Sequence, residues 1–189
     1  SDLIMRMKFI TGVAFLLLIS ASCISQKYEY PFRNPDLSIN ERVDDLLGRL
    51  TPEEKVGQMM NQTPAIDRLG IPPYDWWNEA LHGVARAGKA TVFPQAIGMA
   101  ATFDDEALLK TFSMVSDEAR AKYNQYQKNK EYDRYKGLTF WTPNINIFRD
   151  PRWGRGMETY GEDPYLTGRM GLAVVKGLQG NDPDYFKTH

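Results

Sequence analysis

The sequence of 189 residues has one cysteine and two histidines, and each scarcity excludes a class of structure. A single cysteine, Cys23, cannot form an intrachain disulfide. The two histidines show no metal-ligand spacing, so we expect no metal site. The sequence also lacks the GxGxxG pattern that binds the phosphates of nucleotide cofactors and the GxSxG turn of serine hydrolases. We therefore expect no cofactor.

A large excess of charge of either sign is missing as well. The chain has 23 lysines and arginines against 24 aspartates and glutamates, for a formal net charge of −1. Proteins that bind nucleic acid present a clustered basic surface, so this balance argues against DNA or RNA as a partner. Hydrophobic residues make up 42% of the sequence and charged residues 25%, which is typical of a chain that folds around one globular core.

Long hydrophobic runs are absent. The apolar run at residues 9–19 is shorter than the roughly 20 residues that a membrane-spanning helix needs. This run follows Arg6 and Lys8 and precedes the small residues 20–22, an order that is typical of a secretory signal. We therefore expect residues 1–22 to be a short upstream extension and a signal peptide, and the mature protein to be exported.

Cys23 directly follows these small residues, as in a bacterial lipoprotein cleavage box, where the cysteine becomes the lipidated first residue. The protein would then be a lipoprotein of the outer membrane or the cell surface. The alternative is ordinary cleavage by the general signal peptidase, which gives a periplasmic or secreted protein. A lipid anchor at Cys23 is the only contact with a membrane that the sequence indicates.

Two short helices are predicted after the leader. Ser38 and Glu41 form a capping box, in which each side chain bonds the backbone of the other residue, at the start of the first helix. Thr51 and Glu54 repeat this signal for the second helix, which residues 69–73 end with a glycine and two prolines. We expect the apolar residues at helical spacing to face inward, namely Ile39, Val43, Leu46, Leu47 and Leu50 on the first helix and Val56, Met59 and Met60 on the second.

A long helix and a final helix follow. Asp104 is expected to cap the long helix, and Asp163 to cap the final one, which Gly180 closes. Their predicted inward faces are Leu108, Phe112, Val115, Ala119 and Tyr123 on the first and Leu166, Met170, Ala173, Val174 and Gly177 on the second. Between them, residues 137–141 are expected to form a short buried strand that Pro143 stops. Alternating strands and helices indicate an α/β fold with parallel strands.

Two polar motifs are the most informative part of the sequence. One, YDWWNEALHG, occupies residues 74–83, and the other, RDPRWGRGMETYGEDP, occupies residues 149–164. The second packs three arginines, four carboxylates, three glycines and two aromatic residues into one irregular stretch. This mixture is unsuited to a hydrophobic core. It is suited to binding the hydroxyl groups of a sugar, because charged donors and acceptors make the stronger hydrogen bonds.

Together the two motifs resemble the amino-terminal domain of family 3 glycoside hydrolases, most closely the β-xylosidase and β-glucosidase branch, over residues 28–189. The resemblance implies an α/β fold of the (β/α)8 TIM-barrel type. A closed barrel takes about 250 residues, so residues 23–189 would supply only its first part, with roughly three or four strands. We therefore expect an incomplete barrel in this chain, which would be the opening portion of a longer enzyme.

By this resemblance Glu79 and Arg155 bind the sugar. Glu79 matches the family's carboxylate on the hydroxyls farthest from the scissile bond, and Arg155 matches its sugar-binding arginine. Aromatic rings offer a flat apolar surface to a sugar. Of the adjacent Trp76 and Trp77 we expect one to face the core, and Trp77 is our candidate for lining the site. The family's nucleophile, its acid/base and a sugar-binding Lys-His pair belong to later segments, so we assign no catalytic residue.

Three further features have a structural interpretation. We expect salt bridges and a helix cap, rather than a catalytic acid/base pair, within the group Asp150, Glu158, Glu162 and Asp163 and its neighbours Arg149, Arg152 and Arg155. His82 is expected to hold backbone in a buried turn. Lys187 and His189 are spaced differently from the family's Lys-His pair, so we assign them no contact with the sugar.

The resemblance thus implies part of an exo-acting, retaining β-glycosidase that cleaves O-glycosyl bonds at the non-reducing end of β-linked oligosaccharides. Glu79 favours a β-xylosidase that degrades xylo-oligosaccharides, because glucosidases of the family often have the shorter aspartate there. A β-glucosidase or a dual-specificity enzyme is the alternative. A noncatalytic carbohydrate-binding surface lipoprotein is the alternative of another class, and the coding sequence beyond His189 distinguishes the two. Either way, we expect this chain alone to be inactive.

Overall fold

The structure is a computed structural model that describes residues 28–189. The expected signal peptide and Cys23 lie outside the described residues. The chain divides into two compact units, Ser1–Leu50 and Thr51–His189, and each is described by itself. Within residues 28–189, no helix has both the length and the apolar character that crossing a membrane requires.

The described part of the first unit consists of the 3-10 turn η1 (Pro31–Arg33) and helix α2 (Ile39–Arg49). The predicted capping box at the start of α2 is confirmed. The Ser38 hydroxyl accepts a hydrogen bond from the Glu41 N–H at 3.3 Å, and the Glu41 carboxylate accepts one from the Ser38 N–H at 2.9 Å.

The predicted burial of one face of α2 is wrong. No residue of α2 is buried in the described structure, and Ile39, Val43 and Leu47 are all exposed. Two hydrogen bonds connect α2 with η1. Arg42 donates to the Phe32 carbonyl at 2.9 Å, and the Phe32 N–H donates to the Asp45 carboxylate at 3.1 Å. The helical spacing of apolar residues therefore predicted the helix correctly, but it did not show whether another element packs on its apolar face.

Helix α3 (Pro52–Gly57) opens the second unit, and its capping box has the predicted residues. The expected inward face of this helix is also wrong, because Val56, Met59 and Met60 are all exposed. The helix ends at Gly57, well before the predicted break at residues 69–73. Met59 and Met60 lie in the turn that follows and so lose the helical spacing on which the prediction depended.

The sheet that the described residues form has two short antiparallel strands. Strand β1 (Gln62–Thr63) pairs with β2 (Tyr74–Asp75), with Gln62 opposite Asp75. The 3-10 turn η2 (Asp67–Leu69) lies between them in the sequence. The described chain thus has mixed helical and strand structure, but it does not form the parallel sheet that we expected.

The expected strand at residues 137–141 is not formed. The chain bends at residues 136–138, and the run makes one isolated parallel bridge, between Asn78 and Phe140. Leu138 and Phe140 are buried as predicted, whereas Trp141 is exposed. The sequence therefore indicated the burial of this run correctly and its regular strand geometry incorrectly.

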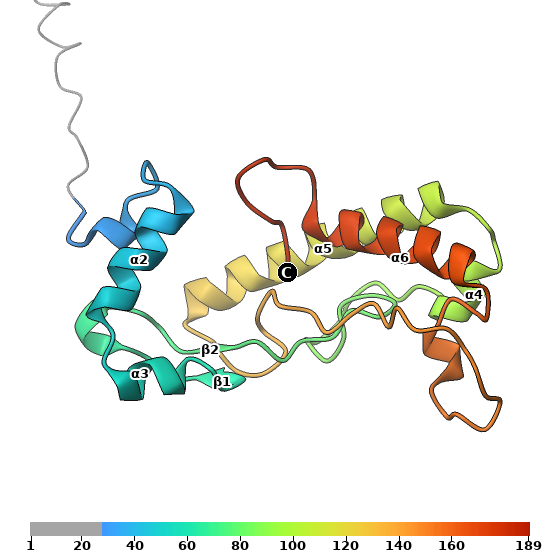
Figure 1. The fold of residues 1–189 in the computed structure, drawn as a ribbon, viewed down its shortest axis with the longest axis horizontal. Coiled ribbons are helices and arrows are strands. Elements are labelled where there is room, and N and C mark those ends of the chain that lie inside the picture. Colours follow the sequence, from blue (N-terminus) through green and yellow to red (C-terminus); the bar gives the residue numbers. More distant parts are fainter. Residues whose placement is uncertain (1–27) are drawn as a thin grey trace, which may run out of the picture. The chain divides into compact units, whose positions relative to one another are not determined.

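The core of the second unit lies along helices α5 (Asp105–Asn129) and α6 (Pro164–Gln179), which pack side by side, with the short α4 (Ala96–Ala100) at one end (Figure 1). The predicted caps are confirmed. Asp104 accepts from the Ala107 N–H at 2.8 Å, and Asp163 accepts from the Leu166 N–H at 2.6 Å.

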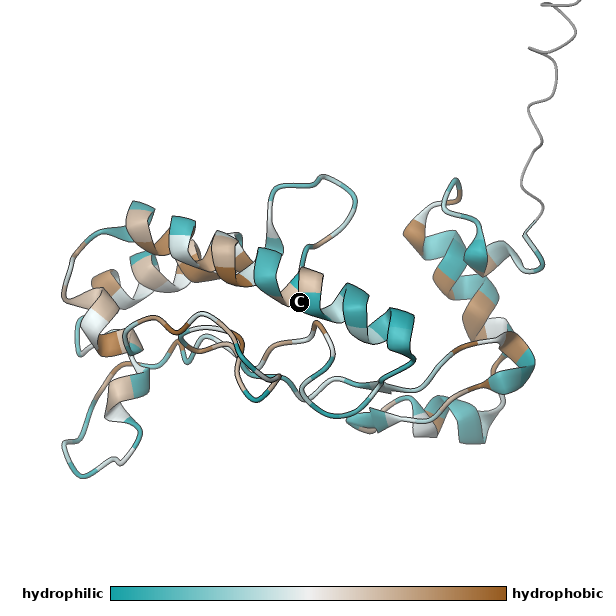
Figure 2. Cartoon of the chain, turned by 180° about the vertical axis from the view of Figure 1, so that it is seen from behind, coloured by the Kyte–Doolittle hydropathy of each residue, from teal (hydrophilic) through white to brown (hydrophobic). Residues whose placement is uncertain are grey.

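The predicted inward faces of these two helices are confirmed. Two of the predicted residues, Tyr123 and Leu166, are partly buried. The others are buried, namely Leu108, Phe112, Val115, Ala119, Met170, Ala173, Val174 and Gly177. Gly177 permits the close approach of the helices, because a Cβ there would lie 2.7 Å from Phe112 Cβ. The end of α5 near Asn129 is hydrophilic (Figure 2). The paired helices form the layer against which the site-bearing loops pack.

Candidate functional site

Hydrogen bonds between residues 74–79 and residues 137–141 position the candidate site. Tyr74 lies at the start of the first motif, and its hydroxyl oxygen accepts from the Leu138 N–H at 2.9 Å and from the Thr139 N–H at 3.1 Å. A single phenol thus satisfies two backbone donors of a run that forms no regular strand. The motif and the second segment are thereby held together although they are far apart in the sequence.

Asn78 supplies the second part of this connection. Its side chain is almost completely buried; it accepts from the Gly137 N–H at 2.8 Å and donates to the Thr139 carbonyl at 3.0 Å. A Cβ at Gly137 would lie 2.7 Å from the Asp75 carbonyl oxygen and 2.8 Å from the Asn78 amide nitrogen, so only glycine fits there. The Asn78 carbonyl also accepts from the Trp141 N–H at 3.0 Å. These bonds fix the backbone immediately before Glu79.

All three sugar-binding candidates line one cavity. Trp77, Glu79 and Arg155 come from the two motifs, and together they border a volume of about 460 Å³. The remaining lining residues are Ala80, Leu81, Arg86, Trp141, Asn144 and Glu158. The fold therefore brings together the residues that the sequence singled out and adds aromatic, amide and charged groups that the sequence did not.

The charged groups in this cavity form two ion pairs. Arg86 Nε lies 3.2 Å from Glu79 Oε2. Arg155 donates to Glu158 Oε2 from Nε at 2.9 Å and from Nη2 at 2.5 Å, and these hydrogen bonds raise the pKa of Arg155 above its ordinary value. Two carboxylates and two guanidinium groups thus cancel in charge at the cavity wall. Sequence reasoning missed Arg86 altogether.

Trp77 and Trp141 line the cavity, and Trp141 stacks on both Trp77 and Trp76. The Trp77 and Trp141 ring centroids are 5.0 Å apart with planes inclined by 17°, and the Trp76 and Trp141 centroids are 5.3 Å apart with planes inclined by 4°. The expectation that one of the adjacent Trp76 and Trp77 faces the core is wrong, because neither is buried. The buried member of this segment is Asp75, whose carboxylate accepts from the Trp77 N–H at 2.9 Å.

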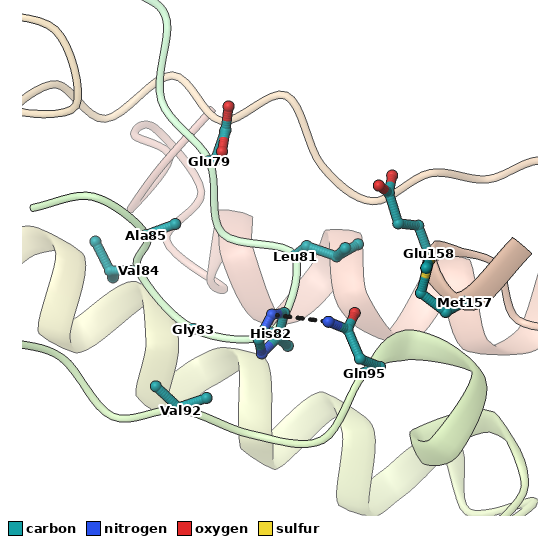
Figure 3. A pocket seen from close by; sticks show the side chains of 10 residues that line it. All are labelled: Glu79, Leu81, His82, Gly83, Val84, Ala85, Val92, Gln95, Met157 and Glu158. Carbon is teal, nitrogen blue, oxygen red and sulfur yellow. Dashed lines mark hydrogen bonds between the residues drawn. The ribbon is translucent and has the colours of Figure 1, made fainter. Parts of the chain in front are cut away.

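A second cavity of about 360 Å³ adjoins the first and shares Glu79, Leu81 and Glu158 with it. Figure 3 shows Glu79 and His82 on one loop, with Glu158 coming from a separate segment, the turn η3 (Gly156–Glu158). His82 Nδ1 lies 2.9 Å from the Phe93 carbonyl oxygen, and its Nε2 lies 3.3 Å from the Gln95 amide nitrogen. His82 therefore holds backbone, as predicted, but it is only partly buried.

The carboxylates of the second motif make mostly structural contacts, as expected. Arg152 donates to Asp150 at 2.9 and 2.6 Å, and this interaction lowers the pKa of Asp150. Asp163 caps α6. One expected salt bridge is wrong, because Arg149 bonds the Asn146 side chain and the Ile147 carbonyl instead of a carboxylate.

Lys187 and His189 do not line the cavity. The Lys187 ammonium group lies 2.8 Å from the Asp117 carboxylate on α5. The His189 N–H donates to the Leu138 carbonyl at 2.9 Å, and the His189 carbonyl accepts from the Phe140 N–H at 2.7 Å. The last residues thus pair with the same run that carries Trp141, and they are part of the framework below the site.

Two stacked aromatic rings, two carboxylate–guanidinium pairs and an amide surround one cavity. A comparison with known protein families identifies the class of protein. The sequence model of the glycosyl hydrolase family 3 N terminal domain matches residues 47–186, and the chain belongs to this family.

Curated relatives and a solved structure are similar over most of the chain. A protein named xylan 1,4-beta-xylosidase from Xylanibacter ruminicola is 54% identical and aligns with 87% of this chain and 20% of its own length. Probable beta-D-xylosidase 7 from Arabidopsis thaliana is 50% identical, with 84% and 21% covered. The structure of a GH3 exo-beta-xylosidase (XlnD), in complex with a xylobiose aziridine probe, superposes with a TM-score of 0.72 and 35% identity, covering 84% of this chain and 21% of that one. The chain therefore spans about a fifth of the length of these proteins.

Proposed function

We propose that the chain is the first part of the catalytic domain of a retaining β-xylosidase that removes single xylose units from the non-reducing end of β-linked xylo-oligosaccharides. The observation that carries this proposal is the meeting of Trp77, Glu79 and Arg155, from two distant motifs, at one cavity. The names of the relatives support xylose as the sugar. A β-glucosidase or a dual-specificity enzyme remains the alternative.

The cavity offers the groups that a neutral sugar needs. Glu79 supplies a carboxylate oxygen that can accept from sugar hydroxyls, and Arg155 supplies a guanidinium group that can donate to hydroxyl oxygens. Such charge-assisted hydrogen bonds are roughly twice as strong as neutral ones. Trp77 and Trp141, which stack on each other, border the cavity with apolar ring atoms against which the C–H groups of a sugar can pack. The groups bind the sugar, and the two carboxyl groups that perform retaining hydrolysis come from later segments of the family domain.

The proposed organisation follows the sequence and the family. Residues 1–22 are an upstream extension and signal peptide, and residues 23–189 are the first part of a (β/α)8 barrel, which in full takes about 250 residues. The protein is exported, either as a lipoprotein anchored at Cys23 or as a periplasmic or secreted enzyme.

The test uses the full-length protein that contains this chain. It is incubated with xylobiose and with an aryl β-xyloside, and the xylose first released from the aryl β-xyloside is identified by proton NMR before its anomers equilibrate. We expect β-xylose, since retention preserves the configuration. First release of α-xylose from the aryl β-xyloside would refute retention, and the absence of xylose from both substrates would refute the proposed activity.

A further inference from the structure

Arg86 has an unusual backbone conformation for a residue of its kind. Its φ is +57°, in the left-handed region, and it is one of four such non-glycine residues in the described chain. This conformation is disfavoured in all residues but glycine, because Cβ approaches the backbone oxygen. It persists where surrounding contacts enforce it, and it is concentrated at binding and active sites.

Hydrogen bonds on both sides of Arg86 enforce its conformation. The carbonyl of the following residue, Ala87, accepts from Lys122 Nζ at 3.0 Å and from the Tyr126 hydroxyl at 2.9 Å, and both donors belong to α5. On the other side, the Ala85 N–H donates to the Glu79 carbonyl at 2.9 Å. Residues 79–85 therefore form a closed loop, and the Arg86 side chain that follows it lies against Glu79.

A second left-handed residue supports the Arg86 guanidinium group. The guanidinium carbon lies 5.4 Å from the centroid of the Tyr135 ring, and Tyr135 has a φ of +68°. The Tyr135 N–H donates to the Trp77 carbonyl at 3.2 Å. Two strained residues from different segments thus place a cation, and the ring on which it rests, against the segment that carries Glu79.

The Arg86–Glu79 ion pair stabilises the fold too little to account for the strained backbone of Arg86. The Arg86 side chain is 64% exposed and that of Glu79 is 36% exposed. Exposed pairs of this kind contribute little to stability, because water screens them and both side chains lose conformational freedom. The left-handed conformation of Arg86 costs free energy, and the ion pair that it permits stabilises the fold only weakly. The orientation that this ion pair gives to Glu79 is therefore the better explanation for the conformation.

We propose that Arg86 is a positioning residue that holds Glu79 in the orientation that binds the sugar. Arg86 engages Glu79 Oε2. Among the described residues Oε1 has no hydrogen-bond partner, and it is the oxygen left for a sugar hydroxyl. This inference rests on the proposed function, because it assigns Arg86 a role through Glu79.

The experiment measures kcat and KM of the full-length protein on an aryl β-xyloside. Arg86→Asn removes the guanidinium group, while asparagine tolerates the left-handed conformation better than most residues. We expect kcat/KM to fall about ten-fold, mainly through KM, with an unchanged melting temperature. Arg86→Lys, which keeps a charge without the planar fork, should recover part of the loss. Lys130→Asn is the matched control, since Lys130 has the same φ of +57° and is exposed at the end of α5; its kcat/KM should stay within two-fold of wild type.

A double-mutant cycle separates this inference from the proposed function. In a Glu79→Ala background, Arg86→Asn should change kcat/KM by less than two-fold, because a positioning residue has nothing left to position. If Glu79→Ala alone leaves kcat/KM unchanged, the proposed role of Glu79 is wrong. If Glu79→Ala lowers kcat/KM while Arg86→Asn does not, or if the two losses multiply, the positioning role is wrong and the proposed function stands.

A purely structural role for Arg86 would give a different result. In that case Arg86→Asn would lower the melting temperature and kcat together, which would overturn the proposal. Should Arg86→Asn not fold, Arg86→Lys carries the same test: a raised KM with unchanged kcat and melting temperature supports positioning, and wild-type kinetics refute it.

Discussion

Replacing Asn78 with alanine should destabilise the domain and disturb the site together. The Asn78 side chain is 1% exposed, accepts from the Gly137 N–H and donates to the Thr139 carbonyl. Alanine leaves both backbone groups without these partners. An unsatisfied buried polar group costs about 1 to 3 kcal/mol. Because both groups lie at partly buried positions, we expect water to recover some of this cost and the total loss to be about 2 to 4 kcal/mol.

The assay is thermal unfolding of the full-length protein by calorimetry, with kcat/KM measured on the same preparations. A loss of this size should lower the melting temperature of the domain by roughly 5 to 15 °C. Asn78→Asp keeps the shape of the side chain and the acceptor for Gly137, but turns an oxygen toward the Asp75 and Thr139 carbonyls, so it should be at least as destabilising at neutral pH. Exposed Asn181 provides the control, and Asn181→Ala should change stability by less than about 0.5 kcal/mol.

Two outcomes would contradict these expectations. If Asn78→Ala and Asn78→Asp both melted with the wild type, the hydrogen bonds between residues 74–79 and 137–141 would not hold the segment that carries Glu79. A lower melting temperature with unchanged kcat/KM would show that the connection stabilises the fold without positioning the site.

The remaining predictions concern activity. Glu79→Asp should shift preference from xylosides toward glucosides, because the shorter side chain leaves room for a hydroxymethyl group. Single-methylene changes are worth about 1 to 3 kcal/mol, so the xyloside-to-glucoside ratio of kcat/KM should fall roughly ten-fold. An unchanged ratio would show that Glu79 does not select the sugar. Arg155→Ala should lower kcat/KM on an aryl xyloside at least about ten-fold, because a charge-assisted hydrogen bond is lost. Arg152→Ala changes a side chain that is 90% exposed and should alter neither activity nor melting temperature. The reverse result would assign sugar binding to Arg152 and the surface ion pair to Arg155. The 189-residue chain alone should release no nitrophenol from aryl β-xylosides, and release above a blank would require a catalytic pair within it.

Local signals predicted local structure well. The capping residues Ser38, Thr51, Asp104 and Asp163 marked four helix starts, because a cap depends on residues within one turn of the chain. The inward faces of α5 and α6 were also predictable, since the two helices cover each other. The apolar faces of α2 and α3 were not, because burial depends on what lies opposite, and helical spacing does not contain that information.

The same distinction applies to the candidate site. Glu79, Trp77 and Arg155 could be selected from their motifs, but their meeting at one cavity depends on hydrogen bonds across distant segments. Arg86 escaped notice because neither its residue type nor its neighbours signal a left-handed backbone, which is enforced by donors on α5. The stacking of Trp76 and Trp77 on Trp141 was missed for the same reason, since the third ring comes from another part of the chain.

The charge arrangement of the cavity suits an uncharged ligand. Each carboxylate is paired with a guanidinium group, so a ligand that entered the cavity would meet no net charge. Each pair also leaves polar atoms for the ligand: among the described contacts, Arg155 uses Nε and Nη2 for Glu158 but not Nη1, and Glu79 uses Oε2 but not Oε1. The ion pairs thus orient one donor group and one acceptor before binding, which reduces the loss of side-chain freedom when a sugar binds. Because an exposed pair stabilises the fold only slightly, this pre-orientation is the stronger physical reason for the two pairs to lie at the cavity wall.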